Sequence, residues 1–280
     1  MAQVWSFLAS AIGVLSLLTP LAAEETVEET NPVGLSIDLI SELEVIAPGK
    51  PFTVGLHLQH QKGYHTYWKN PGIVGMATTL TWDLPKGFTA SDIQWPYPEQ
   101  SLMAGHPCHG YERDVTLLIT ITPPKVITDK AVTLKTSAQW MCCAQNCHPG
   151  FQDFSITLPV GEQAKPTVKG KKLIATAKEE IPKPLKATDF TVSLTSAPDE
   201  KNIQFVISPP PPQQVYFFSS DGQVSSDPPQ ELIKDDNRSL RLTVPRSTYS
   251  PEGKTSLPGI LKLGKSHFLI NPAYPSKTAQ

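Results

Sequence analysis

Proline is the feature that most limits how this chain can fold. The 280-residue sequence contains 28 prolines, spread along its length without a collagen-like period. This distribution favours many short strands joined by proline-containing loops. Hydrophobic residues make up 39% of the chain, enough to build a core. The formal net charge is −2 and there is no basic block, so we expect no nucleic acid partner.

Alternating apolar and polar residues predict strands in the first part of the chain. The turn-forming stretches "APGK", "LPKG" and "TPPK" separate them. This spacing predicts an immunoglobulin-like sandwich over residues 33–161. The predicted strands lie in "VGLSIDLI", "PFTVGLHLQH", "TTLTWDL", "DVTLLITIT", "AVTLKTSAQWM" and "FQDFSITLP".

The pattern breaks at residues 162–188, which we predict to be a linker. Within it, "KKLIATAKEEI" (171–181) has good helix formers and ends before "PKP", which predicts one short helix. A second β-sandwich domain is predicted over residues 189–280, giving an all-β chain of two immunoglobulin-like domains. This second part has no cysteine and one histidine, His267, so we expect it to be structural or to dock partners. Its predicted strands are "FTVSLTS", "NIQFVIS", "QVYFFSS", "SLRLTVP", "GILKLG" and "HFLINP".

The first 23 residues contain no charged side chain and are mostly apolar. They are typical of a signal peptide cleaved near Ala23, followed by an acidic, flexible segment at residues 24–32. A retained anchor is the alternative, although about 15 apolar residues are few for a span that needs about 20. We expect an exported protein that does not span the membrane after cleavage.

Three of the four cysteines lie within "AQWMCCAQNCHPG": Cys142, Cys143 and Cys147. In an oxidising compartment thiols pair, and four cysteines allow three pairings. Because side chains alternate along a strand, Cys142 shares a face with Trp140 and Cys143 with Met141, so the adjacent cysteines should not bond to each other.

Either adjacent cysteine could pair with Cys147 around a short loop. Such a loop adds little stability, which is typical of an exchangeable rather than a structural disulfide. We expect Pro149 to interrupt the strand after the loop, and His148 to be the one nearby group that could tune the thiols.

Several stretches resemble the periplasmic N-terminal domain of the DsbD/ScsB protein-disulfide reductases. They are "GYHTYWKNPGIVGMATTLTWDLPKGF", "IQWPYPE", "GYERDVTLLITIT" and "WMCCAQNCHPG". The motif W-x-x-C-x-x-x-C-x-P of the ScsB-like branch falls on Trp140, Cys143, Cys147 and Pro149. Residues after this domain, including "VYFFSSDGQV" and "LTVPRS", also resemble ScsB-like proteins.

The resemblance implies an immunoglobulin-like domain at residues 33–161 that passes electrons in the periplasm through Cys143 and Cys147. Which of the two attacks and which resolves stays open. Trp140, His148, Pro149 and Tyr111 would shape the site, and no cofactor is expected. Full-length family members also carry a membrane module and a thioredoxin-like domain. We therefore expect a separate membrane electron donor and periplasmic thiol or disulfide proteins as partners.

A second cluster lies in "MAGHPCHGYERD", where we expect His106, Cys108 and His109 in a loop before a strand. The resemblance implies that this segment caps the cysteine pair. Cys108 could then bond Cys142 as a structural bridge. Alternatively, soft ligands from this cluster and the cysteine stretch could bind Cu(I) or Zn(II). The ligands for that alternative are His106, Cys108, His109, Cys143 and Cys147, with Cys142 or His148. A docking module with inert disulfides is the third possibility.

Overall fold

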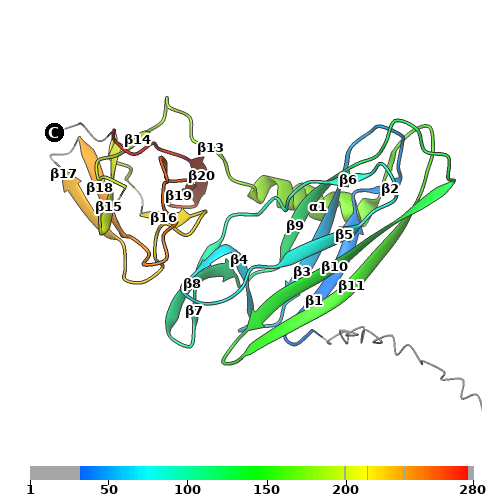
Figure 1. The fold of residues 1–280 in the computed structure, drawn as a ribbon, viewed down its shortest axis with the longest axis horizontal. Helices are drawn as coiled ribbons and strands as arrows, with labels where there is room; N and C mark the ends of the chain where they lie inside the picture. The colour runs from blue at the N-terminus through cyan, green and yellow to red at the C-terminus, as the bar shows by residue number, and fades with distance from the viewer. Residues whose placement is uncertain (1–31, 199, 213, 236–237, 277–280) are drawn as a thin grey trace, which may run out of the picture.

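The computed structural model describes residues 32–276 except residues 199, 213, 236 and 237. The signal-peptide prediction and most of the acidic segment lie outside the described residues. Two groups of sheets follow one another along the chain, which we call the N-terminal region (32–182) and the C-terminal region (183–276) (Figure 1). No helix among the described residues is long and apolar enough to cross a membrane.

Two sheets face each other in the N-terminal region and enclose its core. One has the strand order β1-β3-β9-β6, and the other has the order β11-β10-β4-β8-β7, with β5 also paired to β10. A short β2–β12 pair completes the region. The strands are β1 (Leu35–Ser41), β2 (Leu43–Val45), β3 (Phe52–His60), β4 (His65–Gly72), β5 (Thr79–Asp83), β6 (Thr89–Ala90), β7 (Glu99–Met103), β8 (His106–Tyr111), β9 (Val115–Thr122), β10 (Ala131–Cys143), β11 (Cys147–Pro159) and β12 (Lys165–Pro166). The all-β, immunoglobulin-like fold predicted from the sequence is confirmed for this region.

The helix α1 (Val168–Glu180) starts three residues earlier than predicted, because the Thr167 side chain caps it by accepting a hydrogen bond from the Gly170 amide at 2.9 Å. An added Cβ on Gly170 would overlap the carbonyl oxygen of Ser41, so glycine lets the helix approach β1 closely. Ile174 and Ala177 pack with Leu118 of β9. The segment expected to be a linker therefore packs on the N-terminal region.

This helix explains why β3 differs from the half-buried strand that the alternation predicted. From Phe52 to Leu58 every residue of β3 is buried, including Thr53 and His57. One face points into the sandwich and the other is covered, with His57 Nδ1 lying 2.9 Å from Thr116 Oγ1 of β9. Burial lowers the pKa of His57, which keeps the ring neutral inside this layer.

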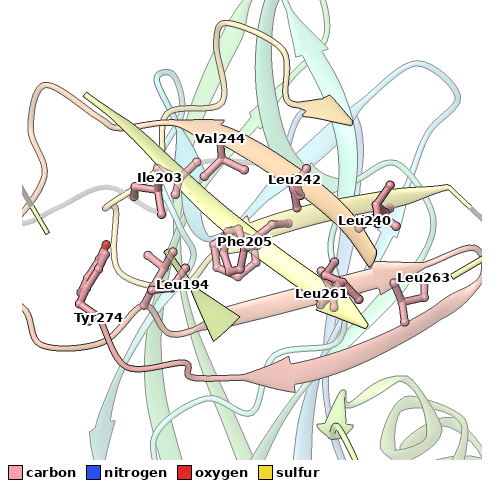
Figure 2. Packing of buried hydrophobic residues seen from close by; sticks show 14 residues of the cluster. Leu194, Ile203, Phe205, Leu240, Leu242, Val244, Leu261, Leu263 and Tyr274 are labelled. Atoms are coloured by element: carbon pink, nitrogen blue, oxygen red, sulfur yellow. The ribbon is translucent and has the colours of Figure 1, made fainter. Parts of the chain in front are cut away.

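The C-terminal region contains two further sheets, with the orders β13-β20-β19-β16 and β14-β15-β18-β17. Their facing sides form an apolar core that includes Phe205, Phe217 and Leu242 (Figure 2). Its predicted strands are all present, and the exposed β17 was missed because its sequence, "ELIKD", lacks a regular apolar alternation. The strands are β13 (Lys183–Pro184), β14 (Thr191–Leu194), β15 (Asn202–Ser208), β16 (Val215–Ser219), β17 (Glu231–Asp235), β18 (Ser239–Pro245), β19 (Gly259–Leu263) and β20 (Ser266–Ile270).

The two regions share a packed boundary. Phe218 and Ile260 belong to the C-terminal region but are buried in the same cluster as Trp68 of the N-terminal region. The rings of Trp68 and Phe218 meet edge to face, with centroids 6.3 Å apart. At another point of the boundary, Tyr97 stacks on His267 with a centroid distance of 3.9 Å.

Candidate functional site

A β-hairpin brings two cysteines together. Cys143 ends β10 and Cys147 begins β11, and the two residues are direct partners across the hairpin. The three-residue turn between them is closed by a hydrogen bond from the Ala144 amide to the Asn146 carbonyl at 3.1 Å. The Sγ atoms of Cys143 and Cys147 lie 2.6 Å apart. The pair therefore needs no backbone rearrangement for its two sulfurs to react with each other.

The two sulfurs of this pair have different surroundings. Cys147 is exposed, whereas Cys143 has 0% of its surface accessible. Burial, together with the neighbouring Cys147 sulfur, raises the pKa of the Cys143 thiol to about 12. A hydrogen bond from Tyr67 acts in the opposite direction. Because an incoming protein can reach only a surface sulfur, Cys147 is the accessible member of the pair.

Tyr67 of the adjacent strand contacts the buried sulfur, and His65 contacts Tyr67. The backbone of β4 pairs with the end of β10, with His65 opposite Cys143, so His65 and Tyr67 share the face of that cysteine. His65 Nε2 lies 3.3 Å from the Tyr67 hydroxyl oxygen. Burial lowers the pKa of His65 and raises that of Tyr67, so the ring is neutral and the phenol keeps its proton to donate.

Neither His65 nor Tyr67, which lie in the "GYHTYW" stretch, was among the residues expected to form the site. The signal that would have found these two residues is the alternation in "HTY", which puts a histidine and a tyrosine on one face of a strand. The sequence pattern could not predict that β4 lies next to the end of β10, because the order of strands in the sheet does not follow their order in the chain.

Two chain segments cover the buried sulfur, and we call them the cover. They are the β7–β8 hairpin and residues 72–77, which follow β4. Met103 and Cys108 of the hairpin pack with Tyr67 and Cys143, and Val74 packs on this cluster. Gly75 lies so close to Tyr67 that an added Cβ would overlap the ring, and its φ of +96° also favours glycine.

Cys108 thus lies in the same cluster as Cys143, as the family resemblance implied. It is not in a loop as predicted. Residues 106–111 form β8, because they pair with β7 on one side and β4 on the other. Burial raises the pKa of the Cys108 thiol to about 11, which keeps it protonated.

Cys142 points to the opposite face of β10 and lies in the sandwich core with Trp140, as the alternation predicted. Burial raises the pKa of its thiol to about 11. All four cysteines are free in the structure. The alternative of a Cys108–Cys142 bridge does not fit, because the two thiols belong to clusters on different faces of the sheet.

The other residues expected to shape the site lie mostly away from the sulfurs. His148 pairs with Cys142 rather than Cys143, and its ring lies 6.3 Å from that of Tyr64, which does not favour the expectation that His148 tunes the pair. Trp140 packs over Gly150, where an added Cβ would overlap the indole. The Tyr111 hydroxyl donates to the Pro96 carbonyl at 2.8 Å inside the sandwich core.

Pro149 does not interrupt the strand, contrary to our expectation. It lies within β11, opposite Met141. This is possible because β11 is the outermost strand of its sheet, where a residue without an amide proton can face solvent.

The metal alternative required its histidines and cysteines to converge, and they do not. His106 is exposed at the turn end of the β7–β8 hairpin, and His109 Nε2 lies 3.0 Å from the Tyr216 hydroxyl oxygen of the C-terminal region. Within the part of the chain that the structure describes, no three His, Cys, Asp or Glu side chains are grouped to hold a metal ion.

Comparisons with known proteins agree with this fold. Residues 38–159 match the family model for the N-terminal domain of the thiol:disulfide interchange protein DsbD. This match supports a DsbD-type N-terminal domain over this part of the chain.

Among solved structures, the chain is similar to the N-terminal periplasmic domain of ScsB from Proteus mirabilis, with a TM-score of 0.61 and 16% sequence identity. The match covers 86% of this chain and 93% of that one, so it extends into the C-terminal region. A marsupial T cell receptor is also matched, with 10% identity over 85% of this chain and 64% of that one, but its TM-score of 0.21 carries no argument. No curated protein matches the chain in sequence.

Proposed function

We propose that this protein exchanges thiols and disulfides with other proteins in the periplasm through Cys143 and Cys147. The observation that carries the proposal is the asymmetric pair at the end of the β10–β11 hairpin, with sulfurs 2.6 Å apart, one exposed and one buried. The DsbD-type family match over residues 38–159 supports the same chemistry.

The asymmetry of the pair supports one order of reaction for the two thiols. The Cys147 thiolate attacks one sulfur of a partner's disulfide, which breaks that S–S bond and releases the other partner sulfur as a thiolate. The resulting mixed disulfide joins Cys147 to the partner. The Cys143 thiolate then attacks the Cys147 sulfur and releases the second partner thiolate.

This sequence transfers two electrons to the partner and leaves a Cys143–Cys147 disulfide. The two protons lost from the cysteines balance those gained by the partner thiols. A dithiol on an electron donor restores the pair by the reverse steps.

Tyr67 supports the step that is hardest for a buried thiol. Cys143 must lose its proton in an apolar cluster, where the charged form is disfavoured. The Tyr67 hydroxyl donates a hydrogen bond to Cys143 and so favours the thiolate. His65, which contacts the same hydroxyl, holds the phenol in position.

The wider biological setting is part of this proposal. Residues 1–23 would direct export, and periplasmic thiol or disulfide proteins would be the partners. A separate membrane protein would supply electrons. Residues 33–161 would be the redox domain and residues 189–280 a second sandwich domain.

Insulin reduction tests the proposal. With dithiothreitol as the electron source, the wild-type protein should accelerate insulin reduction, and Cys147→Ser and Cys143→Ser should each abolish the acceleration. Cys142→Ser is the matched control, because Cys142 neighbours the pair but faces the sandwich core. Equal activity in the wild type and Cys147→Ser would overturn the proposal.

A further inference from the structure

The C-terminal region contributes no cysteine, yet it contacts both parts of the cover. The Ser226 hydroxyl, which is buried, donates a hydrogen bond to the Pro107 carbonyl of β8 at 2.7 Å. It also accepts one from the Ile73 amide, next to the end of β4, at 3.1 Å. A single side chain of the C-terminal region thus connects the β7–β8 hairpin to residues 72–77.

Ser226 also lies in close contact with the backbone of Gly72. Gly72 pairs with Cys108 in the register of β4 and β8. An added Cβ on Gly72 would overlap the Ser226 side chain, and the φ of Gly72 is +94°. Glycine at this position is therefore required for Ser226 to reach both hydrogen-bond partners.

Ser226 is itself held by the framework of the C-terminal region. The two residues before it are fixed by backbone contacts. Val224 forms a bridge with Arg246, and the Ser225 amide donates to the Pro245 carbonyl at 3.0 Å. The Ser225 hydroxyl and the Asp227 backbone are hydrogen-bonded to each other within this turn. Ser226 therefore projects from a rigid turn toward the cover.

Two neighbouring polar contacts also join the C-terminal region to β4 and β8. The Asn70 side-chain amide donates to the Ser219 carbonyl at 2.7 Å, and His109 of β8 contacts the Tyr216 hydroxyl. The strand β8, which is part of the cover, and the strand β4, which precedes residues 72–77, are thus both attached to β16 of the C-terminal region.

We propose that the C-terminal region holds the cover closed over Cys143, and that Ser226 is the positioning residue that does so. The cover would keep Tyr67 against the buried sulfur and keep unspecific oxidants and thiols away from it, while Cys147 stays open to partners. The purpose of the cover rests on the proposed exchange function. The test below does not depend on that function.

The test is the alkylation of the reduced protein by iodoacetamide, followed residue by residue by tandem mass spectrometry. Loss of two hydrogen bonds should favour cover opening, so Ser226→Ala should raise the alkylation rate of Cys143 by about tenfold. Cys142 serves as an internal control in the same molecule, since it is equally buried but lies on the other face of β10. Its rate should stay unchanged.

Two further variants make the result decisive. Ser225→Ala removes a hydroxyl from the same turn that donates a hydrogen bond to the Asp227 carbonyl, and it should leave the Cys143 rate at the wild-type value. Gly72→Ala displaces Ser226 from the cover side and should raise the Cys143 rate as Ser226→Ala does. Because the left-handed backbone of Gly72 is also strained by this change, the ratio of the Cys143 rate to the Cys142 rate is the quantity compared.

An unchanged Cys143 rate in Ser226→Ala would overturn the proposal, and so would an equal rise at Cys142, which indicates general loosening. Alkylation needs no exchange partner. The cover proposal can therefore fail while insulin reduction succeeds, and the reverse.

Discussion

The N-terminal and C-terminal regions are both built from facing sheets, but they differ in what their strands carry. All four cysteines and six of the seven histidines lie in the N-terminal region. The core of the C-terminal region is filled by aliphatic and aromatic side chains such as Phe205 and Leu242. The contribution of the C-terminal region comes instead from its boundary, where Phe218 and Ser226 contact the N-terminal region.

This contrast indicates that the fold alone does not provide the chemistry. A sheet becomes a redox site where two cysteines face each other at a hairpin end and a neighbouring strand supplies a proton donor, here Tyr67. In our proposal, the second region holds that arrangement in place through its contacts with the cover.

The largest expected effect concerns the boundary between the regions. Phe218→Ala should lower the free energy of unfolding by about 3 kcal/mol, because it removes a fully buried ring from the cluster around Trp68. The four tryptophans among the described residues, Trp68, Trp82, Trp95 and Trp140, all lie in the N-terminal region, so their fluorescence during urea unfolding reports that region.

Phe205→Ala is the matched control for this change, since Phe205 packs inside the C-terminal region alone. It should destabilise the C-terminal region and shift the tryptophan transition less than Phe218→Ala does. Equal shifts, or no shift with Phe218→Ala, would contradict a packed boundary.

Much of this arrangement could be predicted from local pattern, and some of it could not. The alternation in "QWMCC" correctly put Cys142 and Cys143 on opposite faces, because side-chain direction in a strand is a local property. The contacts of Tyr67 with Cys143 and of Ser226 with Pro107 depend on which strands become neighbours. Residues 67 and 143, and residues 107 and 226, are far apart in sequence, and no local pattern reports their meeting.

The next effect concerns Tyr67. Tyr67→Phe removes the hydrogen bond to Cys143, so the pKa of that thiol should rise further and the resolving step should slow by about tenfold. The rate at which the reduced protein reduces Ellman's reagent, followed by stopped-flow absorbance, measures this step.

Tyr111→Phe provides the comparison for that measurement. Tyr111 is another fully buried tyrosine, but its hydroxyl bonds to Pro96 in the sandwich core. A similar slowing in both variants would indicate a general effect of losing a buried hydroxyl and would remove Tyr67 from the mechanism.

Acid should weaken the boundary. Burial lowers the pKa of His109 to about 4, below its ordinary value of 6.5, so the unfolded chain binds a proton that the folded chain does not. The stabilisation of the folded protein by neutral His109 is therefore complete above pH 6.5 and is lost as the pH falls toward about 4. Urea unfolding across this range should show smaller acid destabilisation in His109→Gln than in the wild type. An identical pH dependence would show that His109 does not contribute.

The smallest effect is expected for His148. His148→Ala should change the rate of exchange by less than about twofold, because the imidazole lies on the face of Cys142 and contacts Tyr64. The insulin assay measures it, and a loss comparable to that of Tyr67→Phe would show that the imidazole reaches the sulfurs.

The central claim is that Cys147 is the sulfur that attacks a partner's disulfide and Cys143 is the sulfur that resolves the mixed disulfide. Trapping of the mixed disulfide with oxidised glutathione tests it most directly, with intact-mass and peptide analysis to locate the adduct. Cys143→Ser should accumulate glutathione on Cys147, whereas Cys147→Ser should accumulate none on Cys143. Stable glutathione on Cys143 in Cys147→Ser, with no adduct on Cys147 in Cys143→Ser, would contradict the account.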